Sequence, residues 1–225
     1  ATSSACRPDT VRRRHPDAFP HRPAGYPVCL MGFTRADLLA YRDRTVDDLV
    51  GEGCKLLFVG INPGLWTAAT GAHFARPGNR FYPALARAGI VDHVIDASTC
   101  MSDADRTMLL DRGVGITNVV PRATATAAEL TVDEFRKGGL RLRERVREIR
   151  PRVVAVAGIT AYRSAFGRRD AVPGRQDETW DGAELWVVPN PSGLNAHETV
   201  ESLAAAYRRA AAAAGVVDDL RSPPS

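Results

Sequence analysis

The residues of this chain that could perform chemistry are concentrated in two loops of similar sequence. One is Gly60-Ile61-Asn62-Pro63-Gly64, which follows the apolar run 55–59, and the other is Pro189-Asn190-Pro191-Ser192-Gly193-Leu194, which follows the apolar run 185–188. A side-chain amide both donates and accepts hydrogen bonds, although it is a poor base. The first loop lacks the Gly-Lys-Ser/Thr ending of a P-loop, and Ser192 lies outside any Gly-x-Ser-x-Gly motif.

The position of these loops follows from the apolar runs before them. A run of this length, ended by Gly and Pro, is typical of a strand buried on both faces of a parallel sheet, and the next loop emerges at the carboxyl end of that strand. Ligands bind at this edge in open α/β sheets. We therefore expect both Asn-Pro loops at one site, although an isolated Gly-x-Asn-Pro-Gly is also compatible with a plain strand-ending turn.

Strand and helix signals alternate along the chain. The expected strands are 55–59, 114–120, 153–157 and 185–188. The expected helices are 34–50, 79–88, 102–113, 131–150, 160–166 and 198–214. Capping pairs such as Thr131 with Glu134 mark the helix starts. The pattern predicts an α/β fold with three layers, α/β/α, around a central, mainly parallel sheet of about four or five strands.

Composition limits the organisation of the chain. Its 225 residues, 44% hydrophobic and 25% charged, predict a single domain over 31–215, after a basic, Pro-rich irregular extension at 1–30 and before a frayed tail at 216–225. The net charge of +4 and pI of about 9.1 are compatible with a polyanionic partner. Four scattered cysteines and no long apolar segment favour a cytoplasmic protein without membrane contact, metal or cofactor.

A long loop, 71–81, adds an aromatic and Gly-rich segment of the kind associated with function, with Phe74 at its centre. Taken alone, Phe74 could equally be a core residue. The order of motifs Gly-Ile-Asn-Pro-Gly-Leu at 60–65, Pro-Gly-Asn-Arg-Phe at 77–81, Gly-Val-Gly-Ile-Thr-Asn at 113–118 and Asn-Pro-Ser-Gly-Leu at 190–194 resembles the mismatch-specific uracil/thymine-DNA glycosylases of the uracil-DNA glycosylase superfamily. The resemblance covers residues from about 55 to 214.

This resemblance implies a role for each motif around a base that is flipped out of DNA. It makes Asn62 the catalytic residue, which positions the attacking water through its side-chain oxygen. Phe74 would stack on the base, and backbone N–H groups near Ile61 and Phe74 would receive the charge that gathers on it. Asn118 would read the pyrimidine edge, or alternatively only cap the backbone. The full set implied to bind substrate is Ile61, Gly64, His73, Phe74, Asn79 and Asn118.

The second loop is implied to be the DNA wedge. Leu194 would fill the gap left by the flipped nucleotide, while main-chain groups of Gly193 and Asn195 face the orphaned guanine. The implied wedge residues are Asn190, Ser192, Gly193, Leu194 and Asn195. Relatives can carry a basic residue just after the wedge, whereas this chain reads Asn195-Ala196-His197.

Two further observations narrow the implied chemistry. Several aspartates, Asp92, Asp96, Asp103, Asp105 and Asp111, lie between the rim motifs, and one of them could be a stronger base than an amide; alternatively all are caps and solvated charges. The chain has only two lysines, Lys55 and Lys137, and neither lies in a motif. Because a lyase step needs an amine for a Schiff base, a monofunctional enzyme is expected.

The sequence therefore predicts a DNA repair glycosylase that hydrolyses the N-glycosidic bond of uracil, with thymine and etheno-cytosine as further possible bases, and leaves an abasic site. Its expected partner is double-stranded DNA with U·G-type mismatches, bound by a monomer. The alternative is a non-catalytic protein of the same fold that binds damaged or mismatched DNA. A zinc deaminase is disfavoured because the H-x-E and P-C-x-x-C signature is missing.

Overall fold

The computed structural model describes residues 32–218, so the basic extension predicted at 1–30 lies outside the described residues, as does most of the tail. Its centre is a five-stranded sheet in the order β2-β1-β3-β5-β4. The strands are β1 (Leu56–Gly60), β2 (Val114–Asn118), β3 (Val153–Ala157), β4 (Gly174–Trp180) and β5 (Ala183–Val188). All neighbouring pairs are parallel except β4 with β5, which are antiparallel.

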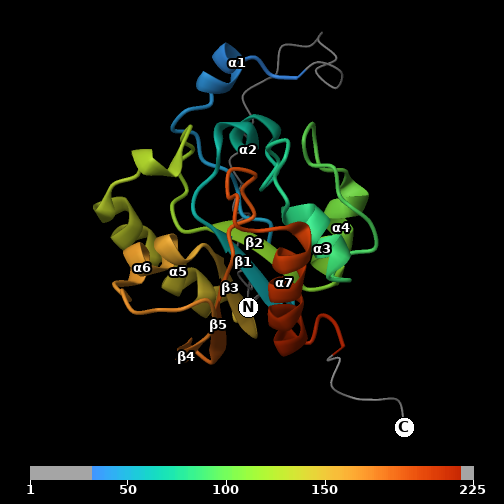
Figure 1. The fold of residues 1–225 in the computed structure, drawn as a ribbon, viewed down its shortest axis with the longest axis vertical. Coiled ribbons are helices and arrows are strands. Elements are labelled where there is room, and N and C mark those ends of the chain that lie inside the picture. The colour runs from blue at the N-terminus through green and yellow to red at the C-terminus, as the bar shows by residue number, and fades with distance from the viewer. Residues whose placement is uncertain (1–31, 219–225) are drawn as a thin grey trace, which may run out of the picture.

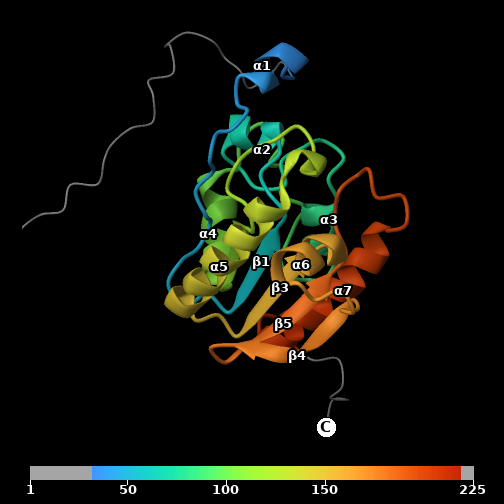
Figure 2. The ribbon, with the colours of Figure 1, turned by 90° about the vertical axis from the view of Figure 1, so that its left-hand side faces the viewer.

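Helices cover both faces of this sheet and confirm the predicted three layers (Figures 1 and 2). Helices α5 (Val132–Ile149) and α6 (Ile159–Phe166) pack together on one face, and α3 (Phe81–Arg87), α4 (Asp103–Asp111) and α7 (Val200–Ala214) lie on the other. The short elements are α1 (Arg35–Leu39), α2 (Leu65–Thr70) and the 3-10 turn Ala127–Glu129. None of the helices in residues 32–218 is long and apolar enough to cross a bilayer.

Strand β1 shows why its sequence is an unbroken apolar run. Leu56 and Phe58 belong to the core shared with α3 and α7, whereas Leu57 and Val59 belong to the core shared with α5 and α6. Successive side chains of a strand point to opposite faces, and here each face is covered by helices. Every position of β1 is therefore buried, and the chain becomes polar only where it leaves the sheet.

The parallel register places the ends of the strands side by side. Gly60, the last residue of β1, pairs with Asn118, the last residue of β2, and Ala157 of β3 pairs with Val188 of β5. The loops that follow these strands consequently emerge at the same edge of the sheet, the upper end in Figure 1 beside α2.

One predicted helix is much shorter in the structure. The expected helix 34–50 ends at Leu39, although its Thr34–Asp37 capping box is present. The chain then runs alongside β2, where the Leu49 N–H donates to the Ile116 carbonyl (2.9 Å) and the Ile116 N–H donates to the Leu49 carbonyl (2.7 Å). Pairing with the sheet edge satisfies these backbone groups and replaces the helix.

The edge strand β4 was not expected from the sequence, because its residues are mostly polar and alternate between half-buried and exposed positions. A tight turn at Asp181 and Gly182 joins it to β5, and both residues have positive φ angles, 48° and 90°. Asp-Gly is the sequence signal of such a hairpin turn. The Asp181-Gly182 dipeptide was therefore the sequence feature from which β4 could have been predicted.

Gly138 allows α5 to approach the segment that follows β2, since a Cβ at this position would overlap the carbonyl oxygen of Val119. We expect Gly138→Ala to lower the free energy of unfolding by about 1–3 kcal/mol, because overpacking outweighs the better helix propensity of alanine. Urea unfolding measures the difference, with Lys137→Ala at the exposed neighbouring position as control. An unchanged or increased stability of Gly138→Ala would show that the helix can move away without cost.

Candidate functional site

The side chain of Asn62 is fixed by hydrogen bonds just beyond the end of β1. Its Nδ2 group lies 3.0 Å from the Pro63 carbonyl oxygen, 2.9 Å from the Arg122 carbonyl oxygen and 2.7 Å from Thr124 Oγ1. Because carbonyl oxygens only accept hydrogen bonds, the amide nitrogen must face them and the orientation of the amide is determined. The Oδ1 atom has no hydrogen-bond donor within residues 32–218 and is available to a water molecule.

The partners of Asn62 are themselves held in place. Thr124 is 1% exposed, and its hydroxyl donates to the Thr126 carbonyl at 2.8 Å, so its oxygen is oriented to accept from Asn62. The Arg122 guanidinium binds both oxygens of Glu134 and one oxygen of Asp43. Hydrogen bonds from this guanidinium and from the Thr131 N–H lower the pKa of Glu134 to about 2. The residues 122–124 that bind the Asn62 amide are therefore themselves fixed by hydrogen bonds and ion pairs.

Asn118 is oriented by a buried histidine. His73 is 4% exposed, and its Nε2 lies 3.0 Å from the carbonyl oxygen of Asp47, which requires a proton on Nε2. Burial lowers the pKa of His73 and favours the neutral ring, so Nδ1 is an acceptor. The Asn118 amide nitrogen, 3.2 Å away, donates to this Nδ1 atom. Asn118 Oδ1 is consequently turned away from His73.

Gly60 lies between Asn118 and Phe74, and no larger residue fits there. A Cβ on Gly60 would lie 2.5 Å from Asn118 Oδ1 and 3.3 Å from the Phe74 ring. Phe74 has a left-handed backbone conformation, with φ of 55°, and stacks on Phe81 with ring centroids 4.0 Å apart and planes inclined by 23°. One face of Phe74 is thus covered by Phe81, and within the described chain no second aromatic ring covers the other face.

Backbone donors complete this part of the rim. The N–H groups of Ile61 and Phe74 bind no acceptor among residues 32–218. These free N–H groups, the Phe74 ring and the two oriented amides follow β1 and β2 at one edge of the sheet, and such groups can bind a planar ligand with several acceptor atoms.

The second Asn-Pro loop, residues 189–198, reaches the same edge of the sheet, and we call it the wedge loop. Side-chain hydrogen bonds stabilise its conformation: Asn190 Oδ1 accepts from the Ser192 N–H at 3.0 Å, and Asn195 Nδ2 donates to the Asn190 carbonyl at 3.2 Å. Leu194 stands at its tip, with 76% of its surface exposed. An exposed leucine on a braced loop has no packing role in the free protein.

A cavity of about 340 Å³ lies between the two loops, and Ile61 is the one residue of the expected substrate-binding set that lines it within the described chain. It is lined by Ile61 from the first loop, by Asn190 and Asn195 from the wedge loop, and by Gly158 and Thr160 at the start of α6. The first loop and the wedge loop thus share one hollow at the carboxyl edge of the sheet.

Other expected site residues have local roles in the structure. Asn79 Oδ1 accepts from the Phe81 N–H at 2.9 Å, and Gly64 is the N-cap residue that precedes α2. Two of the aspartates have local partners: Asp105 accepts from the hydroxyl of Ser102, the N-cap residue of α4, and Asp92 pairs with Arg112. No carboxylate hydrogen-bonds to Asn62, so the described residues give no support to a second base.

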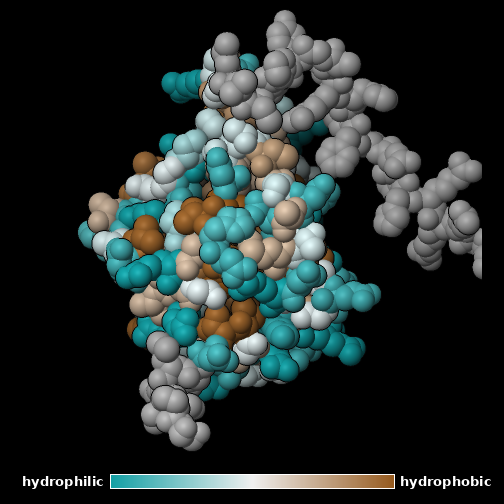
Figure 3. Space-filling view, turned by 90° about the vertical axis from the view of Figure 1, so that its right-hand side faces the viewer, coloured by the Kyte–Doolittle hydropathy of each residue, from teal (hydrophilic) through white to brown (hydrophobic). Residues whose placement is uncertain are grey.

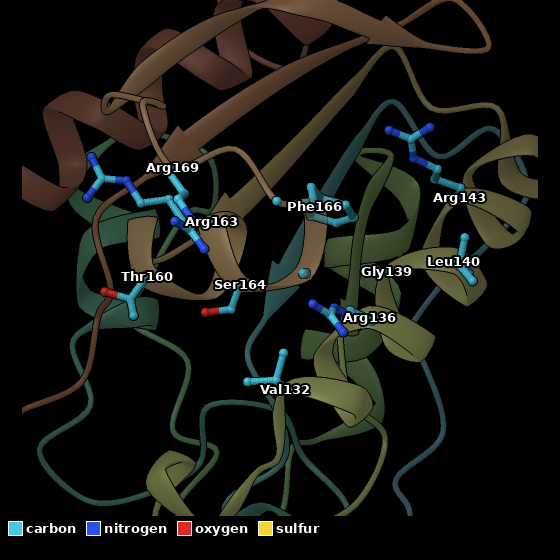
Figure 4. Close-up of a pocket in the computed structure, with 12 residues that line it drawn as sticks. Val132, Arg136, Gly139, Leu140, Arg143, Thr160, Arg163, Ser164, Phe166 and Arg169 are labelled. Atoms are coloured by element: carbon cyan, nitrogen blue, oxygen red, sulfur yellow. The ribbon is translucent and has the colours of Figure 1, made fainter.

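A larger hollow, about 680 Å³, lies between α5 and α6 (Figure 4). Four arginines line it, but Arg143 lies over Trp180 and near Glu178, and Arg163 donates to the Ala171 carbonyl. None of the expected site residues lines this groove. The face on the α3, α4 and α7 side shows separate small hydrophobic areas within a largely hydrophilic surface (Figure 3).

Three residues that support the site were not expected from the sequence. Thr124 and Arg122 hold Asn62, and Arg80 binds carbonyl oxygens of the wedge loop. Only their positions in the sequence could have indicated these roles, since Arg80 lies inside the motif 77–81 and the other two residues follow β2. The carbonyl of Asp47 had no signal at all, because it acts through the backbone.

Fold and site together define an α/β/α protein with an oriented asparagine and a loop that carries an exposed leucine at one edge of its sheet. Residues 48–214 match the family model described as the uracil DNA glycosylase superfamily. The chain belongs to this superfamily. The fold also matches the solution NMR structure of a candidate uracil DNA glycosylase from Methanosarcina acetivorans, with a TM-score of 0.52, 17% identity and coverage of 74% of this chain and 97% of that one.

The buried, neutral state of His73 predicts a pH-dependent stability. Since the pKa of His73 is lowered in the folded protein, the unfolded chain binds a proton that the native state does not, and stability is lost as the pH falls below the ordinary histidine pKa of about 6.5. The loss from this group cannot exceed about 1.4 kcal/mol per pH unit. Urea unfolding between pH 7.5 and 5.5 should show a shallower pH dependence for His73→Gln, whereas His93→Gln, at an exposed position, serves as control. Equal slopes for His73→Gln and wild type would refute the assignment.

Proposed function

We propose that this protein is a monofunctional DNA glycosylase that removes uracil from U·G-type mismatches in duplex DNA. The observation that carries the proposal is the orientation of Asn62: the two N–H bonds of its amide face three acceptor oxygens, which leaves Oδ1 to bind a water molecule. Membership of the uracil DNA glycosylase superfamily supports this reaction class.

The groups that follow β1 and β2 at this edge of the sheet suit a flipped uracil. The free face of Phe74 offers a surface for stacking, which is worth about 1–3 kcal/mol per base in single-strand binding. Because Asn118 donates to His73, its Oδ1 is the atom that presents an acceptor to the base. The N3 atom of uracil or thymine carries a hydrogen and can donate to it, whereas N3 of cytosine carries a lone pair and is repelled. The hydrogen bond between Asn118 and His73 thereby favours uracil over cytosine.

The chemical step depends more on departure of the uracil as an anion than on proton abstraction by a base. The C1′–N1 bond breaks with its electron pair passing to the uracil ring, whose developing charge faces the free N–H groups of Ile61 and Phe74. Water held by Asn62 Oδ1 then adds to the sugar carbon, and the proton that it loses leaves with solvent or with the uracil anion. The products are free uracil and an abasic site, without a covalent enzyme intermediate.

The positions of the lysines support a hydrolytic rather than a lyase mechanism. The Lys55 backbone bonds with Gly113 at the amino-terminal edge of the sheet, opposite the site, and Lys137 is exposed on α5. A Schiff base needs an amine next to the sugar, and neither lysine lies there.

The wedge loop supplies a second contact with DNA, since Leu194 can replace the stacking lost when the uracil leaves the duplex. The expected active form is a monomer bound to double-stranded DNA.

Incubation of the protein with a duplex that contains one U·G pair should release free uracil and leave an alkali-sensitive site. Matched duplexes with U·A and C·G pairs provide the specificity controls, and a known glycosylase confirms the assay. Tight mismatch binding without base release would instead indicate a non-catalytic binding protein.

Asn62→Ala should slow uracil release by about 10²-fold or more, since the oriented water is lost, while the affinity for the U·G duplex changes little. Single-turnover rates and fluorescence anisotropy measure the two quantities separately. Gln176→Ala, which removes an amide from the edge strand β4, is the matched control. A full rate for Asn62→Ala would exclude this residue from the chemistry.

A further inference from the structure

The Arg80 side chain binds the backbone of the wedge loop. Its Nη2 group donates to the carbonyl oxygens of Ser192 (2.6 Å) and Asn195 (2.7 Å), its Nη1 group donates to the Glu198 carbonyl, and its own backbone N–H donates to the Pro191 carbonyl (3.0 Å). One side chain thus collects three carbonyl groups spread over seven residues. Charge-assisted hydrogen bonds of this kind are among the stronger ones in proteins.

These bonds determine which backbone groups the loop presents outwards. All peptide bonds of the described chain are trans, so the N–H of a peptide unit points opposite to its carbonyl. Because the carbonyls of Ser192 and Asn195 face Arg80, the N–H groups of Gly193 and Ala196 face away from it. Both residues are exposed, and neither N–H binds an acceptor among residues 32–218.

The contact between the loops is too close for a side chain. A Cβ on Gly193 would lie 2.6 Å from the carbonyl oxygen of Gly78, which stands two residues before Arg80. Arg80 is in turn followed by Phe81, the ring on which Phe74 stacks. The same short segment, residues 78–81, therefore supports the base pocket on one side and the wedge loop on the other.

We propose that Arg80 is a positioning residue that holds the wedge loop in the conformation needed to enter duplex DNA. This inference rests on the proposed function and extends it to the control of the loop. With its carbonyls fixed, the loop projects Leu194 from a rigid base and turns two backbone donors toward the base opposite the uracil. Guanine offers the O6 acceptor to such donors, whereas adenine has an amino group at this position. Backbone donors set by Arg80 can thus favour guanine without a basic residue after the wedge.

A double-mutant cycle tests this coupling. Single-turnover uracil release from a U·G duplex is measured for wild type, Arg80→Met, Leu194→Ala and the double variant. If Arg80 acts through the loop, each single change should slow the reaction by about 10-fold, and the double variant should be only about 2–3-fold slower than the slower single variant. The ratio of U·G to U·A rates should also fall in Arg80→Met. Arg76→Met, which removes a charge from an exposed position of the loop 71–81, is the control and should keep the wild-type ratio of U·G to U·A rates.

Effects that multiply to about 100-fold in the double variant would overturn the proposal, as would an unchanged rate in Arg80→Met. If Arg80→Met does not fold, Arg80→Lys takes its place, because one ammonium nitrogen cannot reproduce bonds made by two separate nitrogens. Gly193→Ala, which changes no charge, should show the same loss through its clash with Gly78.

A measurement without catalysis separates this inference from the proposed function. NMR order parameters of the wedge-loop amides should lie near 0.85 in the wild type and fall below about 0.6 in Arg80→Met. Equal order parameters in both proteins would refute the role of Arg80 even if the wild type is an active glycosylase. An absence of uracil release by the wild type would refute the proposed function but leave this test of the loop intact.

Discussion

The hydrogen bonds that hold the Asn62 amide are the interaction on which the rest of the site depends. Two backbone carbonyls and the Thr124 hydroxyl fix its nitrogen and leave its oxygen to the rim. They require the segments after β1 and β2 to lie side by side, which follows from the pairing of Gly60 with Asn118. A neutral amide contributes little as a base, so its value lies in orientation, and orientation has to come from this support.

The second principle of the site is that its polar groups are oriented by neighbouring side chains. His73 is kept neutral by burial and turns the amide of Asn118, while Arg80 turns the backbone of the wedge loop. In the function that we propose, neither residue has to touch DNA to influence which bases are accepted. The segment 78–81 contacts both loops, since Phe81 stacks on Phe74 and Arg80 binds carbonyls of the wedge loop.

The sequence was sufficient for the four parallel strands of the sheet, because runs such as 153–157 are apolar at every position and are buried on both faces. It was also sufficient to place Asn62 and Asn190 on one edge. It failed where tertiary contacts replaced local preference: the segment around Leu49 pairs with β2 rather than continuing a helix. It could not identify Thr124 as a partner of Asn62, because sixty-two residues separate them and the contact depends on strand register.

The most direct test of the account is the effect of Thr124→Val on single-turnover uracil release from a U·G duplex. Valine keeps the buried shape but removes the hydroxyl that accepts from Asn62, and a typical hydrogen bond contributes about 1 kcal/mol. The account predicts that the rate falls about 5- to 10-fold while the affinity for the duplex is unchanged. A wild-type rate in Thr124→Val would contradict the claim that the fixed orientation of Asn62 drives the reaction.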